Sequence, residues 1–298
     1  MDCLAAVCQM RPRLGVLPEN LAAHHAWLDR CQEAGADLAV FPELSLTGYF
    51  LRDLTQEVAM PLDAAPVQEL VARSKDMSIA FGMVEVSRDH RYYNSMVFAE
   101  DGKILHVHRK VHLPDYGIFE EGRYFASGDG FLPVESKHGR FGLLVCEDAW
   151  HLSSGYLHFL QGVDALLMTV ASPARGIDTD EPELSSHGAW RTLSEAQALF
   201  FQTWVVRANR IGFEDGTMFW GASAVVSPFG KTVAEACGDQ EELLLQRLSS
   251  DPLRRARMTT PLLRDAKPDM VRRQLAQLLH DPDALRAGGD RNGGSSSA

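Results

Sequence analysis

The segment Gly139-Arg140-Phe141-Gly142-Leu143-Leu144-Val145-Cys146-Glu147-Asp148-Ala149-Trp150 is the part of the chain from which the fold can be worked out. Leu143 to Val145 form a short apolar run, which is typical of a buried strand. Cys146 stands where acidic residues replace the apolar run, so we expect it at the end of that strand. Strand ends face the active-site cleft in layered α/β proteins. A single cysteine beside a buried strand is more often a small core side chain, and only partners elsewhere in the chain favour a nucleophile.

The composition is that of an ordinary globular protein, with 45% hydrophobic and 23% charged residues among 298. The formal net charge of −11 disfavours nucleic acid and anionic membranes as partners. No apolar segment approaches the roughly 20 residues of a membrane span, and the N-terminus lacks the basic segment of a signal peptide. Five cysteines are an odd and sparse number for a disulfide framework. We therefore expect a cytoplasmic protein with reduced thiols.

Predicted strands and helices alternate as far as about residue 250. Apolar runs predict strands at residues 3–9, 37–41, 78–86, 92–99, 104–110, 131–135, 165–171, 204–211, 221–226 and 243–248, and helical patterns cover residues 18–34, 66–75, 153–161 and 186–201. This order is typical of an α/β domain with mixed sheets. An amphipathic pattern follows at 268–280, and a Gly/Ser-rich segment ends the chain. We therefore expect a main domain at 1–250, a C-terminal extension with a helix at 251–287 and a disordered tail at 288–298.

Two further residues stand at predicted strand ends. Glu43 follows Phe41-Pro42, where partial desolvation would raise its pKa toward the range of a general base. Lys110 ends a strand in which it alternates with His106 and His108. Taken alone, Glu43 is more typical of a solvated loop and Lys110 of a polar strand edge. Their interpretation therefore depends on whether they meet Cys146.

Other kinds of catalytic site lack their motifs. His106, His108 and His112 lie close in sequence, but no HExxH or paired CxxC accompanies them, so we expect no metal. The chain contains no GxSxG elbow and no GxGxxG loop after a strand. Gly230-Lys231-Thr232 resembles the end of a P-loop, but Val225 occupies the position of the first glycine. We therefore expect no cofactor.

Three motifs, in this order along the chain, resemble those of the nitrilase superfamily of carbon–nitrogen hydrolases, whose members use a Glu-Lys-Cys triad. The motifs are Val40-Phe41-Pro42-Glu43-Leu44-Ser45-Leu46-Thr47-Gly48-Tyr49, His108-Arg109-Lys110-Val111-His112-Leu113-Pro114 and Val145-Cys146-Glu147-Asp148. The resemblance implies a four-layer αββα sandwich with mixed sheets, in which Glu43, Lys110 and Cys146 are catalytic. It also implies a homodimer or higher homo-oligomer, with contacts through the apolar faces of residues 154–162 and 186–201.

A finer similarity is to the glutaminase domain of glutamine-dependent NAD synthetases, and it rests on residues 43–49, 53–54, 113–125 and 146–150. It implies that Glu121, or its neighbour Glu120, is a further catalytic residue that contacts Lys110. It also implies the substrate-binding residues Tyr49, Tyr116, Glu147 and Ser172.

The sequence departs from the pattern of those domains after Ser172-Pro173. Ala174-Arg175-Gly176 stands where they usually have an aromatic residue, so glutamine itself is in doubt as the substrate. Arg175 is instead a candidate for binding a carboxylate. Fewer than 50 residues follow residue 250, so we expect a stand-alone relative without an ATP-using domain.

Together these features predict an amidase that hydrolyses a small carboxamide to a carboxylic acid and ammonia through a thioester on Cys146. Glu43 would be the general base, and Lys110 with the backbone N–H of Glu147 would stabilise the oxyanion. N-carbamoyl hydrolase and nitrilase activities are alternatives, although no Cys-Trp-Glu run surrounds the thiol, as a true nitrilase would have. A further alternative is a glutaminase-like subunit that supplies ammonia to a partner synthetase.

Overall fold

Two six-stranded sheets form the centre of the molecule. The computed structural model describes residues 1–175 and 185–280, so the predicted tail at 288–298 lies outside the described residues. The first sheet has the order β14-β1-β2-β3-β4-β5, with strands at Asp2–Gln9 (β1), Leu38–Val40 (β2), Ser78–Val86 (β3), Tyr92–Glu100 (β4), Lys103–Arg109 (β5) and Glu242–Ser249 (β14). The second has the order β13-β12-β9-β8-β7-β6, with strands at Val134–Ser136 (β6), Gly139–Val145 (β7), Ala165–Val170 (β8), Trp204–Asn209 (β9), Ala224–Ser227 (β12) and Lys231–Glu235 (β13).

Both sheets are mixed, as predicted. The central strands β1, β2 and β3 run parallel, and so do β7, β8 and β9. The outer strands pair antiparallel. A separate hairpin of Ile211–Glu214 (β10) and Thr217–Trp220 (β11) lies outside the two sheets.

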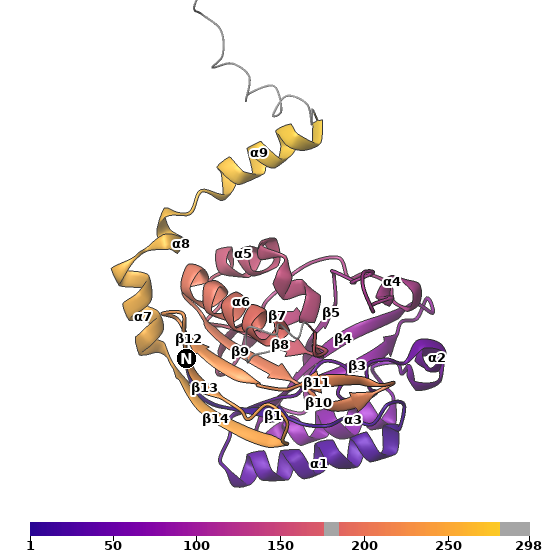
Figure 1. Cartoon of the computed structure of the whole chain (residues 1–298). Coiled ribbons are helices and arrows are strands. Elements are labelled where there is room, and N and C mark those ends of the chain that lie inside the picture. The colour runs from indigo at the N-terminus through magenta and orange to yellow at the C-terminus, as the bar shows by residue number, and fades with distance from the viewer. Residues whose placement is uncertain (176–184, 281–298) are drawn as a thin grey trace, which may run out of the picture.

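Helices cover the outer face of each sheet (Figure 1). Helices α1 (Leu17–Glu33) and α3 (Ala65–Ala72) pack on the first sheet, while α5 (Leu152–Leu160) and α6 (Ser185–Phe201) pack on the second. The remaining helices are α2 (Thr55–Val58), α4 (Glu121–Tyr124), α7 (Ser250–Thr259), α8 (Leu262–Asp265) and α9 (Pro268–His280), with 3₁₀ turns at Arg52–Leu54 (η1), Arg73–Lys75 (η2) and Cys146–Trp150 (η3). The predicted four-layer αββα sandwich of an α/β protein is therefore confirmed.

Strand β1 shows why the layers form. Successive side chains of a strand point to opposite faces, and here both faces are apolar. Cys3, Ala5 and Val7 belong to the core between the two sheets, whereas Ala6 and Cys8 pack with residues of α1 and α3. A strand that is buried on both faces reads as a continuous apolar run rather than an alternating one.

Several strand boundaries differ from the predicted ones, for example β12 at Ala224–Ser227 against 221–226 and β6 at Val134–Ser136 against 131–135. Residues 204–211 were expected to form a single strand, but β9 ends at Asn209 and β10 begins at Ile211. At this break the Asn209 side-chain amide donates to the carbonyl oxygen of Gly221, and the Arg210 guanidinium pairs with Glu214. The predicted C-terminal helix is present as α9, which projects from the body of the molecule and buries none of its residues (Figure 1).

The domain boundaries at 250 and 287 stay predictions. Within the described ranges, no helix has the length and apolar character needed to cross a bilayer.

Candidate active site

Three strands deliver Glu43, Lys110 and Cys146 to one place. Glu43 lies three residues after β2, Lys110 directly follows β5, and Cys146 directly follows β7. The turn around Glu43 is packed against β3 at Gly82, where an added Cβ would lie 2.3 Å from the backbone nitrogen of Leu44. A glycine is therefore needed at this point for β3 to pass beside the turn.

The Lys110 ammonium is the centre of a buried charge cluster. Its Nζ lies 2.8 Å from Oε1 of Glu43 and 2.7 Å from Oε1 of Glu121, and the Lys110 side chain is fully buried. Burial by itself lowers the pKa of Lys110, but the carboxylates of Glu121 and Glu43 outweigh it and hold that pKa well above its usual value. The ammonium is therefore charged at neutral pH.

Glu43 is held rigidly on both carboxylate oxygens. Besides Lys110, its Oε1 accepts a hydrogen bond of 2.7 Å from the side-chain amide of Asn94. Its Oε2 accepts one of 2.9 Å from the backbone N–H of Ala171. Glu121 is the second acid on Lys110, and Glu120 is exposed. The contact with Lys110 is therefore made by Glu121 rather than by its neighbour.

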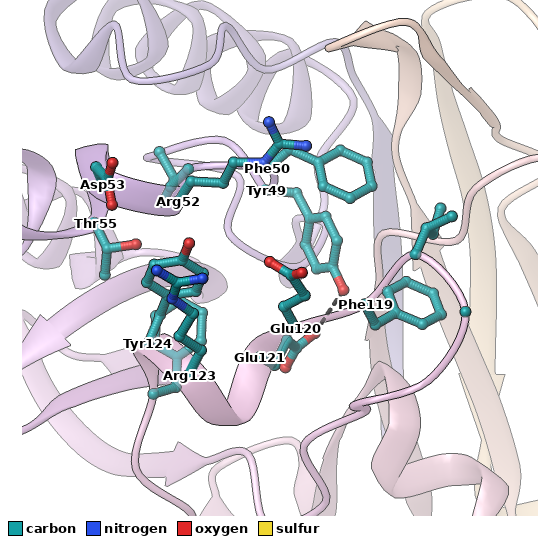
Figure 2. A pocket seen from close by; sticks show the side chains of 14 residues that line it. Tyr49, Phe50, Arg52, Asp53, Thr55, Phe119, Glu120, Glu121, Arg123 and Tyr124 are labelled. Carbon is teal, nitrogen blue, oxygen red and sulfur yellow. Dashed lines mark hydrogen bonds between the residues drawn. The ribbon is translucent and has the colours of Figure 1, made fainter.

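Glu121 begins α4 and is almost fully buried. Its Oε1 also accepts a hydrogen bond of 2.5 Å from the Tyr49 hydroxyl, which points toward it in Figure 2. Burial raises the pKa of Glu121 to about 7, with the Glu43 carboxylate adding to the effect and the Lys110 ammonium opposing it. Two acids and one base thus share the cluster, and one of the acids titrates near neutral pH.

Cys146 lies at the edge of this cluster with only 8% of its surface exposed. Its backbone has a φ of +45°, which directs the chain out of β7 and into the turn η3. Burial raises the pKa of the Cys146 thiol well above its usual value, and the Glu43 carboxylate adds to the rise, while the Lys110 ammonium opposes it. The thiol is therefore protonated in the resting protein and senses the charges of both other residues.

A cavity of about 330 Å³ opens onto the thiol. Four of the five predicted substrate-binding residues line it, namely Tyr116, Glu147, Ser172 and Arg175. The Tyr116 hydroxyl donates a hydrogen bond of 2.8 Å to Oε2 of Glu147, and the Arg175 guanidinium lies over the Phe119 ring at 4.4 Å from its centroid. The wall of this cavity therefore carries an acidic and a basic side chain.

Tyr49, the fifth residue, lies elsewhere. It lines a separate, larger cavity of about 560 Å³ together with Glu121, Phe119 and residues of the η1 turn (Figure 2). Phe119 borders both cavities. The larger cavity does not include Cys146, so the smaller one is the place where a substrate can meet the thiol.

Ser172 has two partners of its own. Its Oγ accepts a hydrogen bond of 3.1 Å from the Trp220 indole, and its backbone N–H donates to Oδ1 of Asn209 at 3.1 Å. Ser172 thus anchors the wall of the thiol cavity to β9 and β11. Whether it also contacts substrate stays a prediction.

Comparison with models of known protein families identifies the family of this chain. Residues 4–258 match the model of the carbon–nitrogen hydrolase family. The chain belongs to the carbon–nitrogen hydrolase family.

This carbon–nitrogen hydrolase is 29% identical over 238 residues to the glutamine-dependent NAD(+) synthetase of Acinetobacter baylyi, a match that covers 80% of this chain and 42% of that protein. It is 27% identical over 270 residues to the N-carbamoylputrescine amidase of Arabidopsis thaliana, covering 85% of this chain and 89% of that protein. The structure of a carbon–nitrogen hydrolase from Helicobacter pylori G27 matches with a TM-score of 0.80 and 27% identity, covering 92% and 99% of the two chains. The hydrolase described here thus spans less than half the length of the synthetase.

Sequence reasoning missed several residues that hold the site of this carbon–nitrogen hydrolase together. His108 was placed on a polar strand edge, in the Lys110 motif and among candidate metal ligands, but its contact with Asp148, in which Nε2 lies 2.8 Å from Oδ2, was not foreseen. Glu214 accepts hydrogen bonds from the backbone N–H groups of Tyr49 and Phe50. Asp148 could have been noticed, because it is an acidic residue only two positions after Cys146. Nothing in the sequence around Glu214 indicated its role.

Proposed function

We propose that this carbon–nitrogen hydrolase is an amidase that cleaves a small carboxamide to a carboxylic acid and ammonia. The observation that carries the proposal is the buried Lys110 ammonium, which two carboxylates hold beside a protonated thiol. Charges in such a dry site interact more strongly than in water. The cluster therefore suits a reaction in which negative charge develops on a carbonyl oxygen.

The first step is attack of Cys146 on the amide carbon. Because burial keeps the thiol protonated, a base must take its proton as the carbon–sulfur bond forms. Glu43 fills that role, because its carboxylate is fixed by Asn94 and Ala171. Lys110 and the backbone N–H of Glu147 donate to the oxyanion of the tetrahedral intermediate, and one such donor is typically worth about 3 kcal/mol.

The second half of the reaction returns the site to its starting state. Glu43 passes the proton to the departing nitrogen, so that ammonia leaves and an acyl thioester remains on Cys146. Glu43 then takes a proton from a water molecule that attacks the thioester and gives that proton to the departing sulfur, so that the carboxylic acid leaves and both the thiol and the Glu43 carboxylate are restored. Glu121 keeps Lys110 charged and in place through its 2.7 Å contact.

We propose that the end of the substrate remote from the amide carries both an ammonium and a carboxylate group. Glu147, which Tyr116 orients, suits an ammonium group, and Arg175 suits a carboxylate. A cavity of about 330 Å³ has room for a small amino-acid amide such as glutamine. The synthetase relative from Acinetobacter supports this class, because it is a glutamine-dependent enzyme.

An N-carbamoyl hydrolase is the second candidate. The N-carbamoylputrescine amidase relative matches over most of both chains, which supports a ureido group at the same thiol. The two activities differ in products, because a ureido substrate releases carbon dioxide as well as ammonia. A nitrilase reaction would consume a nitrile instead. An ammonia-supplying subunit of a partner synthetase would show little turnover without that partner.

The nucleophile is tested by Cys146→Ala. We expect turnover of every amide to be abolished while the variant unfolds at the same temperature as the wild type. Mass spectrometry of the wild type, incubated with a panel of amides, ureido compounds and nitriles, should show an acyl adduct on Cys146. Turnover by the alanine variant, or an acyl adduct on another residue only, would refute the assignment.

A homodimer or higher homo-oligomer in the cytoplasm is proposed as the working form. Exposed apolar side chains of α5 and α6, among them Leu157, Leu199 and Phe200, support contact through these helices. Sedimentation velocity at micromolar concentration tests this assembly, and a monomer would contradict it.

A further inference from the structure

The Asp148 carboxylate collects four hydrogen bonds inside the protein, although sequence reasoning gave it no role. Its Oδ1 accepts from the backbone N–H groups of Val111 at 3.0 Å and His112 at 2.9 Å. Its Oδ2 accepts from the backbone N–H of Val145 at 3.1 Å and lies 2.8 Å from Nε2 of His108. The Asp148 side chain has no exposed surface.

These four donors flank two of the proposed catalytic residues. His108, Val111 and His112 lie two residues before, one after and two after Lys110. Val145 directly precedes Cys146. One carboxylate therefore holds the chain on both sides of Lys110 and at the entrance to the Cys146 turn. Since β5 belongs to the first sheet and β7 to the second, these hydrogen bonds also join the two sheets.

Joining two strands through a buried carboxylate costs the free energy of desolvating its charge. Replacing buried charged groups by apolar side chains often leaves stability unchanged or improves it, so stability alone gives little reason for a buried carboxylate here. Burial alone would raise the pKa of Asp148, but the hydrogen bonds from His108 and the backbone outweigh it and hold that pKa below its usual value. Asp148 is therefore ionised at neutral pH and its geometry is fixed from four directions.

We propose that Asp148 and His108 are positioning residues that set the distance and orientation between the Cys146 sulfur and the Lys110 ammonium. The proposal rests on the amidase mechanism above, in which both groups act on the same carbonyl. Neither Asp148 nor His108 lines the thiol cavity, so they act on the reaction through Cys146 and Lys110 and not through substrate contacts.

The expected signature is a loss of kcat with little change in KM. Asp148→Asn keeps the size of the side chain but turns one acceptor into a donor, which then faces a backbone N–H. We expect kcat to fall about 100-fold, the scale that a displacement of about 1 Å can cause in an active site, with KM nearly unchanged. His108→Ala should produce a smaller loss of the same kind, and His108→Gln, which restores an N–H donor, should recover most of the activity.

His106→Ala is the matched control. His106 lies two residues before His108 in β5, and the four donors to Asp148 do not include it. This variant should keep the wild-type kcat. Thermal unfolding of all variants shows which are folded at the assay temperature, and the His108 variants decide the matter if Asp148→Asn does not fold. A normal kcat in folded Asp148→Asn or His108→Ala, or a rise in KM alone, would overturn the proposal.

A second readout separates this proposal from the proposed function. Iodoacetamide alkylation of Cys146, followed by peptide mass spectrometry, reports the reactivity of the thiol without any amide turnover. We expect slower alkylation of Cys146 in Asp148→Asn and His108→Ala, while the exposed Cys237 reacts at the wild-type rate. If the wild type hydrolyses no amide but the variants still slow alkylation at Cys146, the amidase function fails and the positioning role stands. Unchanged alkylation in folded variants would refute the positioning role.

Discussion

Two clusters of buried charges contact Tyr49, and they differ in the ratio of acidic to basic side chains. The Tyr49 hydroxyl bonds Glu121 of the cluster that contains Glu43 and Lys110. The backbone N–H of Tyr49 donates to Glu214, which forms a buried ion pair with Arg210. The first cluster has two acids on one base, and the second has one acid on one base.

The different ratio of acidic to basic side chains distinguishes a reactive site from a pair that only supports the structure. In the Arg210–Glu214 pair the charges cancel, and the spare carboxylate oxygen holds the backbone of Tyr49 and Phe50. In the Lys110 cluster one negative charge is in excess, and burial raises the pKa of Glu121 to about 7. A surplus acid that titrates near neutral pH is typical of sites that move protons. The variants below test whether this contrast holds.

Removing the proposed general base should have the largest effect. Glu43→Gln keeps the shape and the contact to Asn94 but cannot accept the thiol proton. We expect kcat to fall by about 10⁴-fold, the upper end of what general acid–base catalysis contributes, with the protein still folded by circular dichroism. Steady-state kinetics measures the loss. A variant with one tenth or more of the wild-type kcat would exclude Glu43 as the base.

Removing the acid of the matched pair should instead affect stability. Glu214→Gln leaves the buried Arg210 guanidinium without a counter-charge, and breaking a buried pair in this way costs about 3–5 kcal/mol of unfolding free energy. The glutamine oxygen can still accept from Tyr49 and Phe50, so kcat of the folded variant should stay close to the wild type. Denaturant unfolding and kinetics on the same preparation check both parts. Full stability with a large loss of kcat would assign the pair to catalysis.

The sequence predicted best those elements whose pattern is long and local. Strand β3 was expected at 78–86 and is found at Ser78–Val86, and α6 begins within one residue of its expected start at 186. The hairpin of β10 and β11 was missed, although Asp215-Gly216 at its turn, with φ of +46° and +76°, is a typical hairpin signal. The short helix that presents Glu121 has four residues, which is too few for a helical period to show.

The site was predictable to the extent that its residues belong to recognisable motifs. Glu43, Lys110 and Cys146 were named from three motifs, and Glu121, with Glu120 as its alternative, from the finer similarity over residues 113–125. The structure brings Glu43, Lys110, Glu121 and Cys146 together. Their supports were not predictable in the same way. Glu214 reaches Tyr49 across 165 residues of sequence, and the tertiary fold alone creates such a contact. The sequence likewise gave no reason to place Tyr49 in a different cavity from the thiol.

The surplus acid should set the pH dependence of the reaction. Because the pKa of Glu121 is about 7 in the folded protein and 4.5 for an unperturbed glutamate, the folded protein binds an extra proton between these pH values. The contribution of Glu121 to stability is therefore largest below about pH 4.5 and is lost as pH rises to 7. We expect kcat/KM to rise through pH 7 in the wild type. Glu121→Gln should remove that limb and lower kcat/KM by about 30-fold, equivalent to a hydrogen bond to a charged group of about 2 kcal/mol. An unchanged limb would assign the titration to another group.

The smallest effect is expected from the hydroxyl that joins the two clusters. Tyr49→Phe keeps the ring contacts with Phe50, Phe119 and Phe219 but removes a donor that lowers the pKa of Glu121. The acid limb of kcat/KM should therefore move to higher pH, with a loss of about 1 kcal/mol in transition-state stabilisation. Tyr116→Phe is the matched control, because its hydroxyl donates to Glu147 instead, so it should raise KM and leave the limb in place. If both variants moved the limb alike, Glu121 would not be the group that titrates, and the contrast between surplus and matched charge would lose its functional meaning.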